Sequence, residues 1–108
     1  MKVATVRRFR RKAGWLVRFR IFETDQFIGD ITGNFGTRGK RLSKKLSEYV
    51  YPHLRNNPYF GKNIKKLKNY KPETWRYRIG NYRFFYTIDD KKHIVFMITA
   101  DYRKDIYR

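Results

Sequence analysis

The sequence of 108 residues contains no cysteine and only nine acidic residues. Without cysteine, the chain has no disulfide framework, no thiolate zinc site and no cysteine nucleophile. No stretch approaches the ~18 consecutive apolar residues that a membrane-spanning helix requires. No serine precedes Ser43, which argues against a serine-rich transit peptide at the N-terminus.

Basic residues, in contrast, are abundant: 27 Lys and Arg give a formal net charge of +18. Such a charge opposes compactness by self-repulsion, so it predicts a polyanionic partner. Nucleic acid is the favoured partner. A membrane surface is disfavoured because the basic residues lie on no single long amphipathic helix, and an acidic protein is the remaining alternative. The aromatic content of 19% excludes a disordered basic tail, and the length indicates one domain with a small two-layer core.

The first 21 residues contain no acidic side chain, and five basic residues lie between Arg7 and Lys12. The apolar stretch that follows ends at Arg18 and is too short for a secretory signal. We therefore predict a flexible basic arm over residues 1–15 and a single domain over residues 16–108.

The N-terminal part of this domain predicts a strand followed by two helices. The strand begins near Leu16, with alternating apolar residues up to Ile21. Thr24 is the expected N-cap of a short first helix. A second, longer helix is predicted over residues 39–56, where apolar residues recur at helical spacing, and Pro52 should kink it or end it early.

The remaining sequence predicts three strands. Residues 75–79 and 82–88 alternate in polarity around a tight Gly80–Asn81 turn, and residues 93–100 form an apolar strand in the sheet interior. Residues 61–68 are predicted as a basic loop. The order strand, helix, helix and three strands predicts an α+β fold, a mostly antiparallel sheet with both helices on one face and the other face open.

Three arginines are expected to share the open face of the hairpin. Period-two geometry places Arg76 and Arg78 on one face of their strand, and Arg83 and Phe85 on one face of the next. Guanidinium groups bind phosphates through paired hydrogen bonds, and aromatic rings stack on bases. The spacing therefore predicts an RNA-binding face, with an ordinary solvated strand face as the alternative.

Two further groups of residues are candidates for binding or catalysis. Arg103 and Tyr107 are four residues apart, so one helical turn would bring them to the same side. The second group is a lysine-rich run that is expected to steer phosphates towards the arginines, and it consists of Lys62, Lys65, Lys66 and Lys68.

Neither His53 nor His93 belongs to a metal-ligand spacing or a nucleophile triad, and no metal site is predicted.

Four segments resemble the RelE/ParE superfamily of type II toxin–antitoxin toxins, and in particular its RelE-like branch. They are Leu54–Pro58, Asn63–Leu67, Trp75–Tyr86 and Arg103–Tyr107, of which the hairpin block is the most specific. The resemblance covers roughly residues 16–108. It implies a small twisted antiparallel sheet with two N-terminal helices on one side, in agreement with the fold predicted above.

The resemblance also implies a function. RelE-like members are cytoplasmic, metal-independent endoribonucleases that cut mRNA in the ribosomal A site by attack of a 2′-OH on the adjacent phosphate. The family's two basic strand positions fall on Arg76 and Arg78, and its arginine after the hairpin turn falls on Arg83. Its C-terminal catalytic pair falls on Arg103 and Tyr107. The implied partner is an acidic antitoxin, and the toxin–antitoxin pair is expected to bind operator DNA.

The resemblance leaves the general base and the target open. RelE itself has lysines at the two strand positions, whereas an arginine stays protonated and cannot accept the 2′-OH proton. Tyr107 is one candidate base, and orientation of the substrate on the ribosome is the other. ParE-like members share the fold but poison DNA gyrase, and a non-catalytic RNA- or ribosome-binding module is a further alternative.

Overall fold

The computed structural model describes residues 18–34 and 38–102. The basic arm predicted for residues 1–15 and the predicted site residues Arg103 and Tyr107 lie outside the described residues. In chain order the elements, with η marking π-helical segments, are β2 (Arg20–Glu23), α1 (Asp25–Gly29), η2 (Asp30–Asn34), α2 (Arg38–Lys45), η3 (Leu46–Val50), α3 (Tyr51–Asn56), β3 (Ile64–Lys66), β4 (Trp75–Ile79), β5 (Tyr82–Asp89) and β6 (Ile94–Tyr102).

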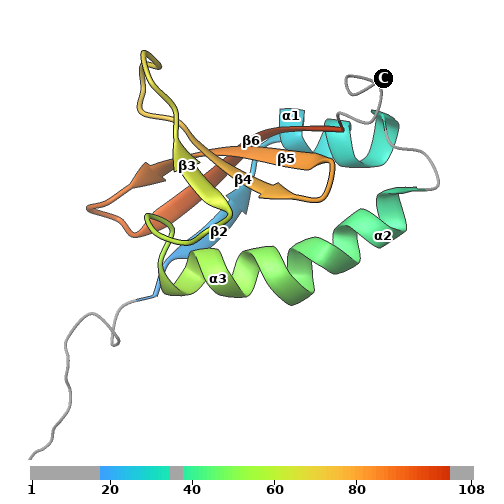
Figure 1. The fold of residues 1–108 in the computed structure, drawn as a ribbon, viewed down its shortest axis with the longest axis horizontal. Coiled ribbons are helices and arrows are strands. Elements are labelled where there is room, and N and C mark those ends of the chain that lie inside the picture. Colours follow the sequence, from blue (N-terminus) through green and yellow to red (C-terminus); the bar gives the residue numbers. More distant parts are fainter. Residues whose placement is uncertain (1–17, 35–37, 103–108) are drawn as a thin grey trace, which may run out of the picture.

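The strands form one five-stranded sheet in the order β2-β6-β5-β4-β3 (Figure 1). β2 pairs parallel with β6, and the other three pairings are antiparallel. The predicted α+β fold with a mostly antiparallel sheet is therefore confirmed. The prediction of a continuous loop over residues 61–68 is wrong, because Ile64–Lys66 add an edge strand to β4. The half-buried Ile64 lies opposite Tyr77 and anchors this strand to the core.

The first helix begins at the residue that the sequence predicts as its N-cap. The backbone N–H of Phe27 donates to the Thr24 hydroxyl oxygen at 3.3 Å, and that hydroxyl donates to the Met97 carbonyl at 2.7 Å. The buried carboxylate of Asp30 accepts hydrogen bonds from the Thr99 hydroxyl and the Ala100 backbone N–H. These contacts hold α1 and η2 against β6, beyond the point where β2 ends.

The second helix runs through Pro52 instead of ending before it. α2, η3 and α3 follow one another without interruption and form a bent helix beneath the sheet (Figure 1). The backbone N–H of Tyr51 donates to the Leu46 carbonyl five residues earlier, which is the hydrogen bond of a π-helical turn. Because proline clashes with the preceding turn and lacks an N–H, this wider turn accommodates Pro52 at the start of α3. None of the described helices is long and apolar enough to cross a membrane.

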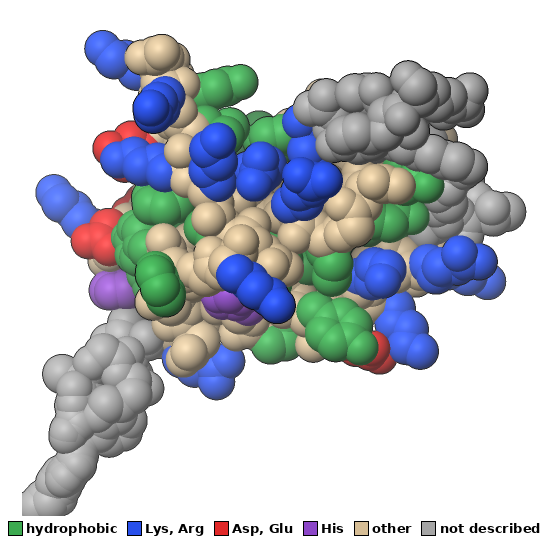
Figure 2. All heavy atoms as spheres, in the orientation of Figure 1, with side chains coloured by type: hydrophobic (Ala, Val, Ile, Leu, Met, Phe, Trp, Pro, Cys, Tyr) green, Lys and Arg blue, Asp and Glu red, His purple; other side chains and the backbone are tan. Residues whose placement is uncertain are grey.

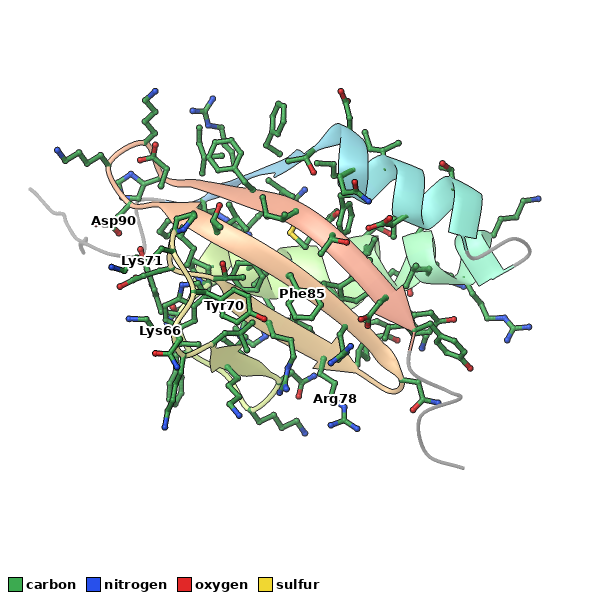
Figure 3. All side chains as sticks on the ribbon, turned by 90° about the horizontal axis from the view of Figure 1, so that it is seen from above. Lys66, Tyr70, Lys71, Arg78, Phe85 and Asp90 are labelled. Carbon is green, nitrogen blue, oxygen red and sulfur yellow. The ribbon has the colours of Figure 1, made fainter. Side chains whose placement is uncertain are left out.

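The core lies between the long helix and one face of the sheet. On β5, alternate residues Tyr82, Phe84 and Tyr86 are buried, and Val95 and Met97 continue this layer on β6. The helix contributes a buried apolar stripe of Leu42, Leu46, Val50 and Leu54. Figure 3 looks onto the opposite face of the sheet, which no described helix covers. Basic side chains are thereby left on a face that an incoming ligand can reach.

His53 joins the end of the long helix to the sheet. Its Nδ1 lies 3.3 Å from the Tyr77 hydroxyl, and its Nε2 lies 2.9 Å from the Phe60 carbonyl oxygen. The ring also packs against Gly61 so closely that a Cβ atom at this glycine would lie 2.3 Å from His53 Cε1. With both ring nitrogens engaged, the imidazole cannot move aside at low cost.

We therefore expect Gly61→Ala to lower the free energy of unfolding by about 1–3 kcal/mol, the usual cost of overpacking. Gly29→Ala is the matched control, because nothing lies within 4 Å of a Cβ at that helical position and alanine favours helices. Urea unfolding followed by circular dichroism measures both variants. Equal stability of the two would contradict the steric role of Gly61.

Candidate functional site

Strand pairing collects basic side chains on the open face of the sheet. Lys65 lies opposite Arg76, which in turn lies opposite Phe85, and in the next row Arg78 lies opposite Arg83. We call these five side chains the arginine face. The predicted sharing of one face by Arg76, Arg78, Arg83 and Phe85 follows directly from this register, whereas Lys65 joins it because β3 forms.

Arg76 has no ion pair with any of the described residues. Its side chain is half-buried between the strands that carry Lys65 and Phe85. Its Nε atom is buried and has no hydrogen-bond partner among the described residues. A buried donor without an acceptor carries a desolvation penalty of about 1–3 kcal/mol, more when the group is charged. The described residues therefore leave this donor of Arg76 unsatisfied.

Arg83 is held by a carboxylate that the sequence analysis did not single out. Its Nε donates to Asp101 Oδ1 at 2.9 Å and its Nη2 donates to Asp101 Oδ2, a two-point ion pair. The guanidinium also lies 5.5 Å from the centre of the Phe85 ring. The last strand was predicted to end at Ala100, but β6 continues to Tyr102. Period-two alternation past the buried Ala100 is the signal that would have placed Asp101 on this face.

Arg78 lies directly across from Arg83 and is exposed. Like charges at opposite strand positions repel, and Asp101 offsets this repulsion from one side. The Nε of Arg78 donates to the Gly80 carbonyl at 3.4 Å. Beside it lies an open hollow of about 450 Å³, lined by Lys62, Asn63, Arg76, Arg78, Ile79 and Gly80. This hollow brings Lys62, a predicted RNA-binding residue, next to the two arginines of β4.

The four lysines that the sequence groups as one run are separated by the pairing of β3. Lys65 belongs to the arginine face, whereas Lys66 points to the other side of the strand, where it pairs with Glu73 and lies 5.8 Å from the Trp75 ring centre. Lys62 and Lys68 are exposed in the segments that flank the strand. Only Lys62 and Lys65 therefore adjoin the arginines directly.

Several described tyrosines are poorly suited to act as a general base. Burial raises the pKa of Tyr51, Tyr77 and Tyr86 above the ordinary value, and the hydrogen bond to Glu23 raises that of Tyr51 further. Burial and the hydrogen bond to Asp90 raise the pKa of Tyr59 to about 12. Each of these side chains remains protonated near neutral pH. No group of three or more His, Asp or Glu in residues 18–34 and 38–102 is placed to hold a metal ion.

The site is thus dominated by positive charge. One carboxylate, that of Asp101, pairs with one of the four cations of the arginine face. Figure 2 shows Lys and Arg side chains in a band over the strands and beside the projecting β3–β4 loop. The arrangement can bind and orient a phosphate group and stabilise negative charge that develops on it.

Comparison with known proteins agrees with this fold. Residues 23–107 match the family model described as the ParE toxin of the type II toxin–antitoxin system parDE. Because this match spans most of the chain, the protein belongs to that family, and it is a toxin of a type II toxin–antitoxin system within the RelE/ParE superfamily. No curated protein matches the sequence significantly.

Solved structures of superfamily members are similar to this chain. The toxin–antitoxin complex RelBE2 from Mycobacterium tuberculosis matches with a TM-score of 0.68 and 24% identity, covering 83% of this chain and 97% of the other. The YoeB–YefM complex from Staphylococcus aureus matches with a TM-score of 0.59 and 26% identity, covering 80% and 98%. The free RelE toxin mutant from E. coli matches with a TM-score of 0.57 and 20% identity, covering 82% and 86%.

The ion pair between Arg83 and Asp101 should contribute measurably to stability. We expect Arg83→Gln and Asp101→Asn to be non-additive, with a coupling of about 0.2–1 kcal/mol, because Asp101 is partly exposed and its charge is screened by water. Urea unfolding of the two single variants and the double variant forms the double-mutant cycle. Strict additivity would show that the pair contributes nothing to the folded state.

Proposed function

We propose that this toxin is an endoribonuclease that cleaves mRNA, acting on the ribosome, and so inhibits translation. The observation that carries the proposal is the cluster of four cations on the open face, where Arg76 lies beside Lys65 and Arg78 lies across from Arg83. A phosphate of RNA supplies acceptors for the guanidinium groups of this cluster. The resemblance to RelE-like toxins supports the same reaction: the basic residues Arg76 and Arg78 stand at the two strand positions, where RelE itself has lysines, and Arg83 stands at the arginine after the hairpin turn.

In the proposed reaction the RNA supplies its own nucleophile. The 2′-oxygen attacks the adjacent phosphorus, the O2′–P bond forms and the P–O5′ bond breaks. The products are a 2′,3′-cyclic phosphate and a 5′-OH, so one proton leaves the 2′-OH and one proton is delivered to the 5′-oxygen. Negative charge grows on the phosphate oxygens in the transition state, and fixed guanidinium groups stabilise it there.

Each arginine has a distinct role in this proposal. Arg76 and Arg78 donate hydrogen bonds to the non-bridging oxygens from β4. Asp101 occupies the Nε and Nη2 of Arg83, which leaves its Nη1 to donate to the phosphate while the guanidinium stays oriented. Phe85 offers a ring at the centre of the open face, on which a base can stack (Figure 3).

The proton acceptor is proposed to come from the C-terminal residues. Arginines stay protonated, and the tyrosines whose pKa is raised keep their protons. β6 leads the chain to Tyr102, one residue beyond the carboxylate that holds Arg83. Arg103 and Tyr107 follow in the sequence. We propose that Tyr107 accepts the 2′-OH proton and that Arg103 adds to the charge around the phosphate.

An acidic antitoxin is the proposed protein partner. The similar structures from M. tuberculosis and S. aureus are complexes of a toxin with its antitoxin. A net charge of +18 favours fast and salt-sensitive association with an acidic protein. We also propose that the resulting complex binds operator DNA through the antitoxin.

The family match favours a second candidate, a ParE-like inhibitor of DNA gyrase. The two candidates differ in their need for a phosphate-binding arginine set. A gyrase inhibitor acts by binding a protein, so its activity does not require Arg76 to contact a scissile phosphate. An mRNA cleavage assay and a gyrase supercoiling assay on the same variants therefore distinguish the two candidate functions.

We expect the wild-type toxin to produce new mRNA cuts in a cell-free translation reaction. Arg76→Ala should reduce the cutting rate about 10²–10³-fold, which is the usual effect in enzymes of losing one preorganised hydrogen-bond donor that stabilises the transition state. Primer extension maps and quantifies the cuts. Lys44→Ala is the matched control, because it removes the same charge from an exposed position on α2 and should leave cutting unchanged. Intact mRNA together with inhibited gyrase supercoiling would instead establish the ParE-like function.

A further inference from the structure

The loop between β3 and β4 projects from the sheet as a hairpin (Figure 1). Its base is closed in two ways. The backbone N–H of Leu67 donates to the Thr74 carbonyl at 2.9 Å, and Lys66 Nζ lies 3.0 Å from Glu73 Oε2. Within the loop, the Thr74 hydroxyl donates to the Pro72 carbonyl at 3.0 Å. The residues at the tip of the loop are therefore held by the closed stem of the hairpin.

Tyr70 stands near the tip of this loop and is 56% exposed. It has no hydrogen-bond or ring partner among the described residues. The hydroxyls of Tyr51, Tyr59 and Tyr86, in contrast, donate to Glu23, Asp90 and the Pro58 carbonyl. An exposed aromatic ring on a closed loop contributes little to the core, so we look for a role of Tyr70 in the residues around it.

Those surroundings are basic and concave. A hollow of about 1080 Å³ is lined by Lys66, Leu67, Lys68, Asn69, Tyr70, Lys71 and Glu73. Glu73 is the one acidic side chain in this lining, and Lys66 already pairs with it. Lys68 and Lys71 are both exposed and flank Tyr70 in the sequence. A ring between two lysines provides a stacking surface for a base together with charges for the neighbouring phosphates.

The loop begins directly after β3, the strand that carries Lys65 of the arginine face. In projection onto the open face of the sheet, Tyr70 lies between Lys71 and Phe85 (Figure 3). Phe85 is the cross-strand neighbour of Arg76. A single strand whose phosphate binds at Arg76 can therefore continue past Lys65 towards the hairpin, which carries the exposed ring of Tyr70.

We propose that Tyr70 is a stacking platform for a base of single-stranded RNA that flanks the nucleotide held at the arginine face, with Lys68 and Lys71 contacting its phosphates. This proposal rests on the proposed function, because the arginine face supplies the neighbouring phosphate site. Stacking on an aromatic ring tolerates any base, so the platform would strengthen binding and set the path of the strand without dictating its sequence.

The test is equilibrium binding of the full chain to a hexanucleotide of 2′-O-methyl RNA that carries 2-aminopurine at one position, scanned along the strand. The methyl group removes the nucleophile, so no cleavage takes place. For Tyr70→Ala we expect a Kd about 5- to 100-fold higher and loss of the stacking-dependent quenching of 2-aminopurine at one position. Tyr70→Phe keeps the ring and should retain both the affinity and the quenching.

Tyr49→Ala is the matched control. Tyr49 is 58% exposed and also has basic neighbours, Arg41, Lys44 and Lys45, but it lies on the helical side of the molecule. We expect Tyr49→Ala to leave both the Kd and the 2-aminopurine quenching unchanged. Thermal unfolding establishes that the variants remain folded, as substitution of exposed side chains should allow. Equal behaviour of Tyr70→Ala and Tyr49→Ala in both readouts would overturn the platform.

The outcome is separable from that of the cleavage experiment. Arg76→Ala should raise the Kd but keep the quenching at saturating protein, because the platform is intact. A toxin that cuts mRNA but shows no effect of Tyr70→Ala refutes the platform alone. A chain that cuts no mRNA but loses the quenching in Tyr70→Ala keeps the platform and refutes the nuclease. A wild-type chain that does not bind the RNA refutes the platform even where mRNA is cut.

Discussion

The antiparallel pairing of β4, β5 and β6 is the constraint on which the rest of this molecule depends. Its register places Arg76 beside Phe85, Arg78 beside Arg83, and Arg83 beside Asp101. The same register buries Tyr77, Phe84 and Tyr86 on the other face, against the long helix. A shift by one residue would exchange the two faces, burying arginines and exposing aromatic rings. The apolar core therefore fixes the position of every charged group of the arginine face.

This coupling explains how a chain with a net charge of +18 can hold cations close together. Repulsion between Arg78 and Arg83 opposes their cross-strand pairing, yet the aromatic residues beneath them supply the burial that keeps the strands aligned. Asp101 neutralises part of the repulsion through its ion pair with Arg83. Arg76 has no ion pair with any of the described residues, and its buried Nε has no acceptor among them. Burial of aromatic residues on one face of the sheet thus holds together the cations on the other.

The sequence was sufficient to predict the elements whose signals are local. The Thr24 cap, the hairpin around Gly80 and the alternation along β4 and β5 each depend on short-range periodicity, and the structure contains all three. β3 escaped prediction because three residues are too few to show a period, and its lysines suggested a loop. The helix was also predicted to kink or end early at Pro52, and it bends without ending, because a π-helical turn lets it continue, an adjustment that residue spacing does not reveal.

The candidate site shows the same division between local and long-range information. Alternation predicted that Arg76, Arg78 and Arg83 share a face, but it gave no sign that Arg83 is already engaged. That pairing joins residues 18 positions apart and depends on β6 extending past Ala100. Tyr70 lies in a loop without periodicity, so only its exposure and its place beside the sheet draw attention to it. Long-range pairing therefore decides which of the predicted residues are available to a ligand.

An open face built from arginines suits binding and charge stabilisation better than proton transfer. Arginine holds its proton under all ordinary conditions, and burial or a carboxylate partner favours the protonated form of the tyrosines that pack beneath and beside the sheet. Neither the arginines of the arginine face nor these tyrosines are suited to accept the 2′-OH proton. In the proposed nuclease the base comes from the C-terminal residues, and the alternative is orientation of the substrate on the ribosome. Either route makes catalysis depend on assembly around the substrate, whereas the side chains proposed to bind the phosphate are already fixed on the sheet.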